Sequence, residues 1–118
     1  MPDFRGSQAY NAVYAKLVEA AKNKATVTYV DLSIVAGLPS RGEHMAQTLN
    51  AILREVMVEN INKQEPLLPA LVLKRGDTLP GNGFFMTAGS LLGISFKSED
   101  DKAIFWEDKV KQAYLYWE

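Results

Sequence analysis

The stretch 26–53, TVTYVDLSIVAGLPSRGEHMAQTLNAIL, constrains the fold of this chain more than any other part of it. It contains two patterns in which a hydroxyl residue is followed three positions later by an acidic residue, which is the spacing of a helix capping box. The two pairs are Thr28 with Asp31 and Ser40 with Glu43. Between them a Gly-Leu-Pro turn at 37–39 ends one helix and prevents its simple continuation. Two helices joined by a short turn that contains glycine are typical of a helix-turn-helix.

The composition places limits on the function. With 118 residues, the chain is predicted to form one domain, 1–118. It carries 13 basic and 14 acidic residues, for a net charge of −1, and it has no cysteine. The charge balance counts against a dedicated nucleic-acid binder, although a local basic patch can exist within a neutral total. The missing cysteines exclude disulfides and thiol nucleophiles. No apolar run approaches the roughly 20 residues that span a bilayer, so we expect a cytoplasmic protein without a membrane partner.

Helical periodicity and β-branched runs predict the elements up to residue 60. Ser7 can cap a first helix over 8–24, a short strand follows over 25–29, and the second helix covers about 31–36. The third helix, about 41–60, has one continuous apolar stripe with helical spacing. The stripe consists of Met45, Leu49, Ile52, Leu53, Val56 and Met57.

The second half of the chain suggests a hairpin and a last helix. The apolar run 67–73 and the segment 84–87 are predicted strands, and the Gly-rich stretch 74–83 between them is a predicted wing. A last helix over 99–117 begins with Ser98 as its cap and carries an aromatic-rich stripe that includes both tryptophans. We expect these aromatics to pack against the first helix; a dimer or partner interface is the alternative. The expected fold class is α+β, a winged helix-turn-helix (helix-strand-helix-helix-strand-wing-strand) plus this C-terminal helix.

Four segments in order resemble a family of small, uncharacterised bacterial proteins. They are PLLPALVL at 66–73, PGNGFF at 80–85, FW at 105–106 and VKQAYLYW at 110–117. The family has a Pro-Leu-Leu segment, a Pro-Gly-x-Gly-Phe-Phe motif and a terminal Tyr-x-Tyr-Trp-like run in the same order. The resemblance implies a common fold and no known activity.

A second resemblance covers about residues 13–83. The run TYVDLSIVAGLP at 28–39 is similar to the Thr-Tyr-Gly-x-Ile-Ala-x-x-x-Gly-x-Pro stretch of the O6-alkylguanine-DNA alkyltransferases and alkyltransferase-like proteins. Farther along, 68–73 lines up with the Ile-Pro-Cys-His-Arg-Val of that family. The resemblance implies a winged helix-turn-helix that enters the minor groove of DNA.

The chain departs from this family at the residues that carry its chemistry. Ala70 stands at the position of the reactive cysteine, Leu71 at that of the histidine and Val72 at that of the arginine. Glu43 stands where the family has the arginine that inserts into the base stack. Because an alanine supplies no thiolate, alkyl transfer is excluded. A glutamate also reverses the charge that an arginine wedge needs for base flipping.

The candidate nucleic-acid-binding residues lie on the third helix and at the base of the wing. They are Arg41, His44, Gln47, Arg54, Lys74 and Arg75. Arginine and glutamine can contact phosphates or the edges of guanine and adenine. The alternative is a solvated helix face, because nearby glutamates dilute the positive potential. Glu43 could cap its own helix or face a ligand.

No catalytic, metal or cofactor site can be assembled from the sequence. His44 is the only histidine, and no cysteine or second histidine accompanies it. The loop 80–83 lacks the Lys-Ser/Thr ending of a phosphate-binding loop. We therefore expect a non-enzymatic domain that binds double-stranded DNA through helix 41–60 and the wing 74–83. The alternative is a protein-interaction or dimerisation module on the same scaffold that has lost DNA binding.

Overall fold

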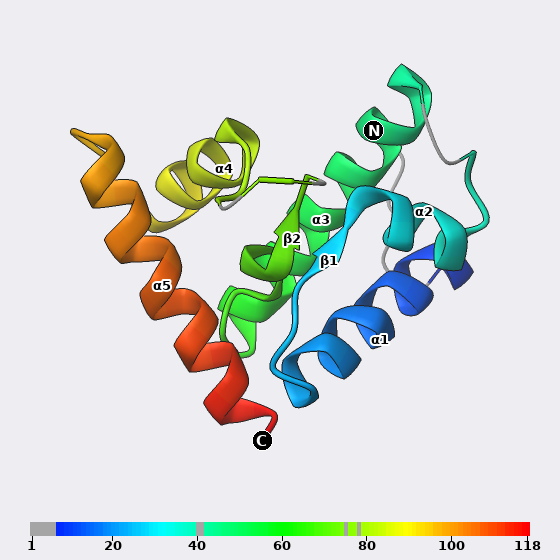
Figure 1. The fold of residues 1–118 in the computed structure, drawn as a ribbon, viewed down its shortest axis with the longest axis horizontal. Helices are drawn as coiled ribbons and strands as arrows, with labels where there is room; N and C mark the ends of the chain where they lie inside the picture. Colours follow the sequence, from blue (N-terminus) through cyan, green and yellow to red (C-terminus); the bar gives the residue numbers. More distant parts are fainter. Residues whose placement is uncertain (1–6, 40–41, 75, 78) are drawn as a thin grey trace.

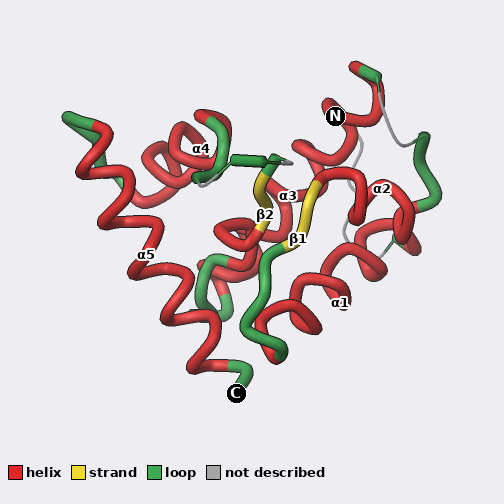
Figure 2. Tube along the Cα trace, in the orientation of Figure 1, coloured by secondary structure: helices red, strands yellow, loops and turns green. Residues whose placement is uncertain are grey.

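The computed structural model describes residues 7–39, 42–74, 76–77 and 79–118. Figures 1 and 2 show two short strands at the centre, with α4 and α5 on one side and α1 and α2 on the other. The elements in chain order are α1 (Gln8–Lys22), β1 (Val27–Thr28), α2 (Tyr29–Ala36), α3 (Glu43–Asn62), the 3-10 helix η1 (Leu68–Leu71), β2 (Val72–Leu73), α4 (Asn82–Leu92) and α5 (Glu99–Tyr116).

The first half of the chain forms the helices that the capping patterns predict. The Ser7 side chain accepts from the N–H of Tyr10 at 3.1 Å. Thr28 and Asp31 form the reciprocal capping box of α2, each side chain accepting from the other's backbone N–H. Gly37 ends α2 in the left-handed region, with φ 74°. These parts of the prediction are confirmed.

The start of α3 differs from the predicted one. The predicted cap Ser40 lies outside the described residues. The helix begins at Glu43, and Gly42 occupies the N-cap position with φ 106°. Glu43 is therefore the first residue of α3, where its negative charge complements the positive end of the helix.

The predicted winged helix-turn-helix is wrong, because the strands pair differently. β1 and β2 are parallel, with Val27 opposite Val72 and Thr28 opposite Leu73. Among the described residues these two strands form the whole sheet. The segment 67–73 is mostly the 3-10 helix η1, which Pro69 helps to start, and only its last two residues are a strand. Since β2 pairs with β1, the stretch 74–83 does not connect two antiparallel strands.

The predicted strand at 84–87 lies inside α4. Phe84, Ala88 and Leu91 recur at helical spacing, and they pack into one cluster with Met57 and Leu67. Gly93 then ends the helix, with φ 71°. This burial favours a helix over the strand that the aromatic pair at 84–85 suggested.

The main core lies between α1, α3 and η1. Its fully buried side chains include Val13, Leu17, Leu49, Ile52, Val56, Leu68 and Leu71. The expected packing of α5 is confirmed for Tyr114 and Trp117, which lie against the core that α1 shares, whereas Phe105 packs in the cluster of α4 and Trp106 bonds to η1. The ring of Phe105 contacts those of Phe84 and Phe96, with centroids 6.1 and 5.0 Å away. The aromatic side of α5 therefore covers both the main core and the cluster beside α4.

Candidate functional site

The outer face of α3 carries three of the six residues predicted to contact nucleic acid. His44, Gln47 and Arg54 are all exposed. Lys74 is also exposed and directly follows β2. Arg41 and Arg75 lie outside the described residues. The structure therefore describes four of the predicted positions, and all four are on the surface.

A further polar residue, Asn50, completes this face of α3. It lies three residues after Gln47 and four before Arg54, so the three side chains share one side of the helix. At the start of the helix, Gln47 Nε2 donates to Glu43 Oε1 at 3.4 Å. Within the described part of the chain, the Arg54 guanidinium makes no ion pair. Arg54 is therefore the cation on this face that is available to an anion.

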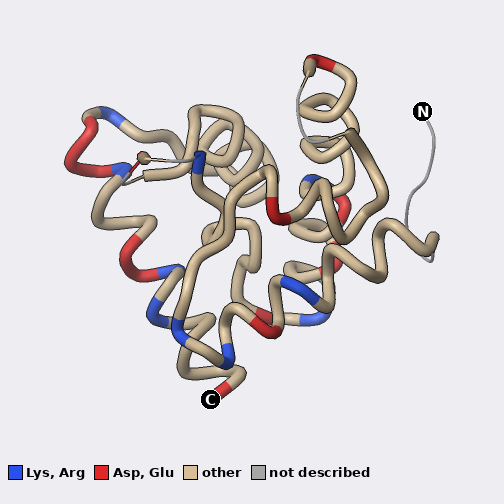
Figure 3. The backbone as a smooth tube through the Cα atoms, turned by 45° about the vertical axis from the view of Figure 1, so that its right-hand side comes forward, with Lys and Arg blue, Asp and Glu red and all other residues tan. Residues whose placement is uncertain are grey.

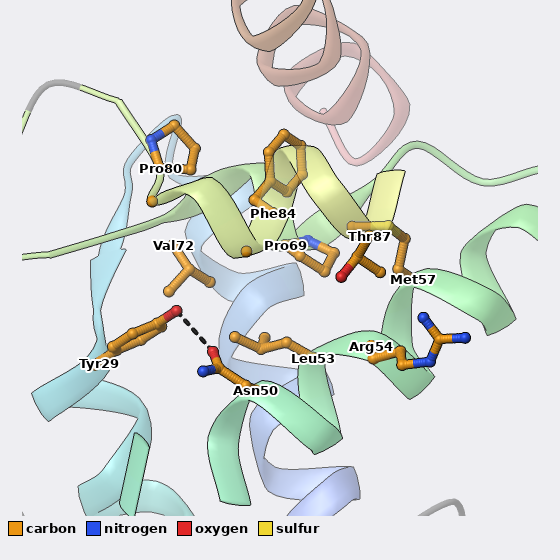
Figure 4. A pocket seen from close by; sticks show the side chains of 12 residues that line it. Tyr29, Asn50, Leu53, Arg54, Met57, Pro69, Val72, Pro80, Phe84 and Thr87 are labelled. Atoms are coloured by element: carbon orange, nitrogen blue, oxygen red, sulfur yellow. Dashed lines mark hydrogen bonds between the residues drawn. The ribbon is translucent and has the colours of Figure 1, made fainter. Parts of the chain in front are cut away.

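A cavity of about 140 Å³ adjoins this polar face (Figure 4). It lies between α3, the start of α2, η1 with β2, and the first half of α4. The lining residues are Tyr29, Asn50, Leu53, Arg54, Met57, Pro69, Val72, Pro80, Gly81, Gly83, Phe84 and Thr87. Their apolar side chains form the interior, and the polar ones come from α2, α3 and α4.

One hydrogen bond fixes the polar wall of the cavity. The hydroxyl of Tyr29 donates to Asn50 Oδ1 at 2.9 Å, as the dashed line in Figure 4 shows. A tyrosine hydroxyl is protonated at neutral pH, and burial raises the pKa of the Tyr29 hydroxyl further. Because Oδ1 of Asn50 is occupied, its amide NH2 is the group left for another partner.

Lys74 lies next to one of the residues that line this cavity. Its Cε lies 3.8 Å from the position that a Cβ would take on Gly81, which is one of the lining residues. Arg54 and Lys74 come from α3 and from the segment after β2, two parts of the chain well separated in sequence. Of the two, only Arg54 lines the cavity, while His44 lies farther toward the start of α3.

The position that the alkyltransferase resemblance gives to a reactive cysteine is closed in this structure. Ala70 is fully buried, and its carbonyl oxygen accepts from Nε1 of Trp106 at 2.7 Å. It does not belong to the lining of the cavity. Among the described residues, no group of three or more histidine, aspartate or glutamate side chains could hold a metal ion.

Charge is spread over several elements. Figure 3 shows lysine and arginine positions interleaved with acidic ones along α5, and further basic positions near the C-terminus. Few basic positions lie along α3. Of the helices in the described ranges, none combines the length and apolarity needed to cross a membrane.

Sequence reasoning missed most of the cavity. Asn50 could have been found, because it shares the helical spacing of Gln47 and Arg54. Phe84 and Thr87 were missed because their segment was predicted as a strand, and they reach the cavity only when 82–92 forms a helix. Comparisons of the chain with protein-family models, with curated proteins and with solved structures found no match.

Proposed function

We propose that the protein is a non-enzymatic domain that binds duplex DNA through the exposed face of α3. The observation that carries this proposal is the position of Arg54, an exposed cation without an ion pair among the described residues. It shares a helix face with Gln47 and Asn50, and Lys74 is exposed next to Gly81, which lines the cavity beside Arg54. The proposal includes a cytoplasmic location, where the protein would meet DNA.

These side chains can contact both the phosphates and the base edges of a duplex. Arg54 and Lys74 supply the cations that phosphate contacts require. The amides of Gln47 and Asn50 can pair with the edge of adenine when the helix lies in a groove. Gln47 would first have to leave Glu43, to which it donates at 3.4 Å. This exchange is inexpensive because both side chains are exposed.

The number of phosphate contacts determines how strongly binding should depend on salt. Counting Arg54 and Lys74, with Arg41 and Arg75 as further candidates, the number of phosphate contacts lies between two and four. The logarithm of the binding constant should therefore fall with the logarithm of salt concentration with a slope of roughly −2 to −4. A fluorescence-anisotropy titration of a labelled duplex at several salt concentrations measures this slope. Failure to bind any duplex at low salt would exclude the proposal.

Single substitutions test which residues meet the phosphates. Arg54→Gln and Lys74→Gln should each weaken binding to all sequences and make the slope shallower by about one. Lys111→Gln is the matched control, because Lys111 is exposed on α5 and has no ion pair among the described residues. An equal loss of binding in the control would show that the contact is not specific to the α3 face.

The apolar surface of α2 favours protein contact as a second candidate function. Ile34 is 66% exposed, and Val30 and Val35 on the same helix are 42% and 38% exposed. Exposed apolar residues that cluster on one helix are typical of interaction surfaces. Measuring the mass in solution by light scattering tests self-association directly. If the protein is a monomer at high concentration and Ile34→Lys does not change its mass in solution, dimerisation through α2 is excluded.

A further inference from the structure

The cavity beside α3 has the size of a single ring. Its volume of about 140 Å³ is close to that of an engineered apolar cavity, roughly 150 Å³, that binds benzene. The side chains of Leu53, Met57 and Val72 meet those of Pro69 and Phe84 across it, so most of its wall is apolar. An apolar ring is therefore the group that fills the interior.

The rim of the cavity offers hydrogen-bond donors and positive charge. On one side of the rim, the Tyr29 hydroxyl and Asn50 Oδ1 already bond to each other. Thr87 adds a hydroxyl group, and Arg54 lies at the edge beside Met57 and Thr87. Within the part of the chain that the structure describes, no acidic side chain belongs to the lining. A ligand with an anionic, acceptor-rich group matches such a rim, whereas a cationic ligand would find no partner.

We propose that this cavity binds a monocyclic aromatic carboxylate. The ring occupies the space between Leu53 and Phe84, and the carboxylate lies at the rim, where it accepts from the guanidinium of Arg54. Charge-assisted hydrogen bonds to arginine are among the strongest that a carboxylate can make. This site shares Arg54 with the proposed contact with DNA, but it can be filled and tested without nucleic acid.

Benzoate is the probe, and benzamide is its neutral counterpart of nearly the same shape. Each is titrated into the 15N-labelled full chain without DNA, and binding is followed by amide chemical shifts. We expect saturable shifts with benzoate in α3 and in the first half of α4. The affinity for benzamide should be about tenfold lower, because it lacks the charge that Arg54 recognises. Equal affinity for both compounds would contradict the role of the carboxylate.

Two variants of the same type locate the contact. Arg54→Gln should lower the affinity for benzoate about tenfold and leave that for benzamide unchanged. Lys111→Gln, an exposed substitution on α5, should change neither. Both positions are on the surface, so folding is expected to survive, and the amide spectrum of each variant verifies this. No saturable shifts at about 10 mM benzoate, shifts confined to other elements, or an unchanged affinity in Arg54→Gln would each overturn the proposal. None of these outcomes bears on DNA binding, which is measured separately.

Discussion

Trp106 on α5 donates its indole N–H to the backbone carbonyl oxygen of Ala70 in η1, with an N–O distance of 2.7 Å. The bond joins two segments that are 36 residues apart in the sequence. Ala70 is fully buried, so its carbonyl group has no access to bulk water. The last helix is thus tied to the connection between α3 and β2 by a specific polar contact as well as by apolar packing.

Replacing Trp106 by phenylalanine tests this contact. Trp106→Phe retains most of the apolar surface and removes the donor, so a buried carbonyl oxygen loses its partner. We expect a loss of about 1–3 kcal/mol in the free energy of unfolding, measured by urea denaturation. Trp117→Phe is the matched control, since no hydrogen bond to the Trp117 indole occurs among the described residues. Equal losses in the two variants would show that packing alone accounts for the effect.

Much of the first half of the fold could be predicted from local chemistry. The helix starts at Ser7 and Thr28 are set by side chains that accept backbone N–H groups within three residues, and such contacts are visible in the sequence. The apolar stripe of α3 likewise predicts its buried face, including Leu49 and Ile52. These elements depend little on what packs against them.

The segment 67–93 could not be predicted in this way, because its structure depends on distant partners. The apolar run 67–73 has strand-like composition, but Val72 and Leu73 alone pair with β1, which lies more than forty residues earlier. The turn residues at 80–83 suggested a hairpin, whereas Gly81 and Gly83 begin α4. A helical signal was present in the spacing of Phe84, Ala88 and Leu91 and in the terminal glycine at 93.

The candidate site was only partly predictable for the same reason. The exposed face of α3 follows from helical spacing, so Gln47 and Arg54 were found. The cavity beside them exists only because α4 packs over α3 and places Phe84 opposite Leu53. Its lining therefore depends on an element that the sequence alone assigned to a strand.

The two glycines of α4 should respond in opposite ways to alanine. A Cβ on Gly89 would lie 2.8 Å from the backbone oxygen of Ile94, whereas one on Gly83 would meet nothing within 4 Å. Gly83→Ala should stabilise the protein by up to about 1 kcal/mol, because alanine favours helix. Gly89→Ala should destabilise it by about 1–3 kcal/mol, since a backbone segment must move. Thermal unfolding of the two variants measures whether each is more or less stable than the unmodified protein. Stabilisation by Gly89→Ala would contradict the close approach.

Asn60 holds the turn after α3 through two hydrogen bonds. It is fully buried; its Oδ1 accepts from the N–H of Leu68 at 3.0 Å and its Nδ2 donates to Glu65 Oε1 at 3.1 Å. Asn60→Asp keeps the shape but places a second carboxylate against Glu65. We expect a loss of roughly 2–4 kcal/mol at pH 7, measured by urea denaturation.

The loss in Asn60→Asp should depend on pH. Burial and the neighbouring Glu65 raise the pKa of the new carboxyl group above its unfolded value. Between the two pKa values the folded state binds more protons, so stability falls as the pH rises and is partly recovered at about pH 4.5. Asn62→Asp, an exposed change on the same helix, is the control and should cost little. An equal loss at both pH values would argue against a buried carboxylate pair.

Tyr14 links α1 to the same turn and should control the alkaline stability of the protein. Its hydroxyl donates to the carboxylate of Glu65. Burial raises the pKa of this hydroxyl, and the hydrogen bond and negative charge of Glu65 raise it further. Above about pH 10 the unfolded chain loses this phenolic proton while the folded protein keeps it, so stability falls as the pH increases.

Tyr14→Phe removes the titrating group and the hydrogen bond together. At pH 7 the variant should lose about 1.5–3 kcal/mol, as expected for a hydrogen bond to a charged acceptor. Above about pH 10 the stability of the variant should fall less steeply with pH than that of the unmodified protein. The difference between the two slopes should correspond to about one proton. Urea unfolding at a series of alkaline pH values compares the two slopes directly, and lysine deprotonation affects both proteins alike. Tyr116→Phe, which removes a hydroxyl from a ring that is 55% exposed, is the control for stability at pH 7. Parallel slopes for Tyr14→Phe and the unmodified protein would mean that the folded state releases the Tyr14 proton as readily as the unfolded chain does.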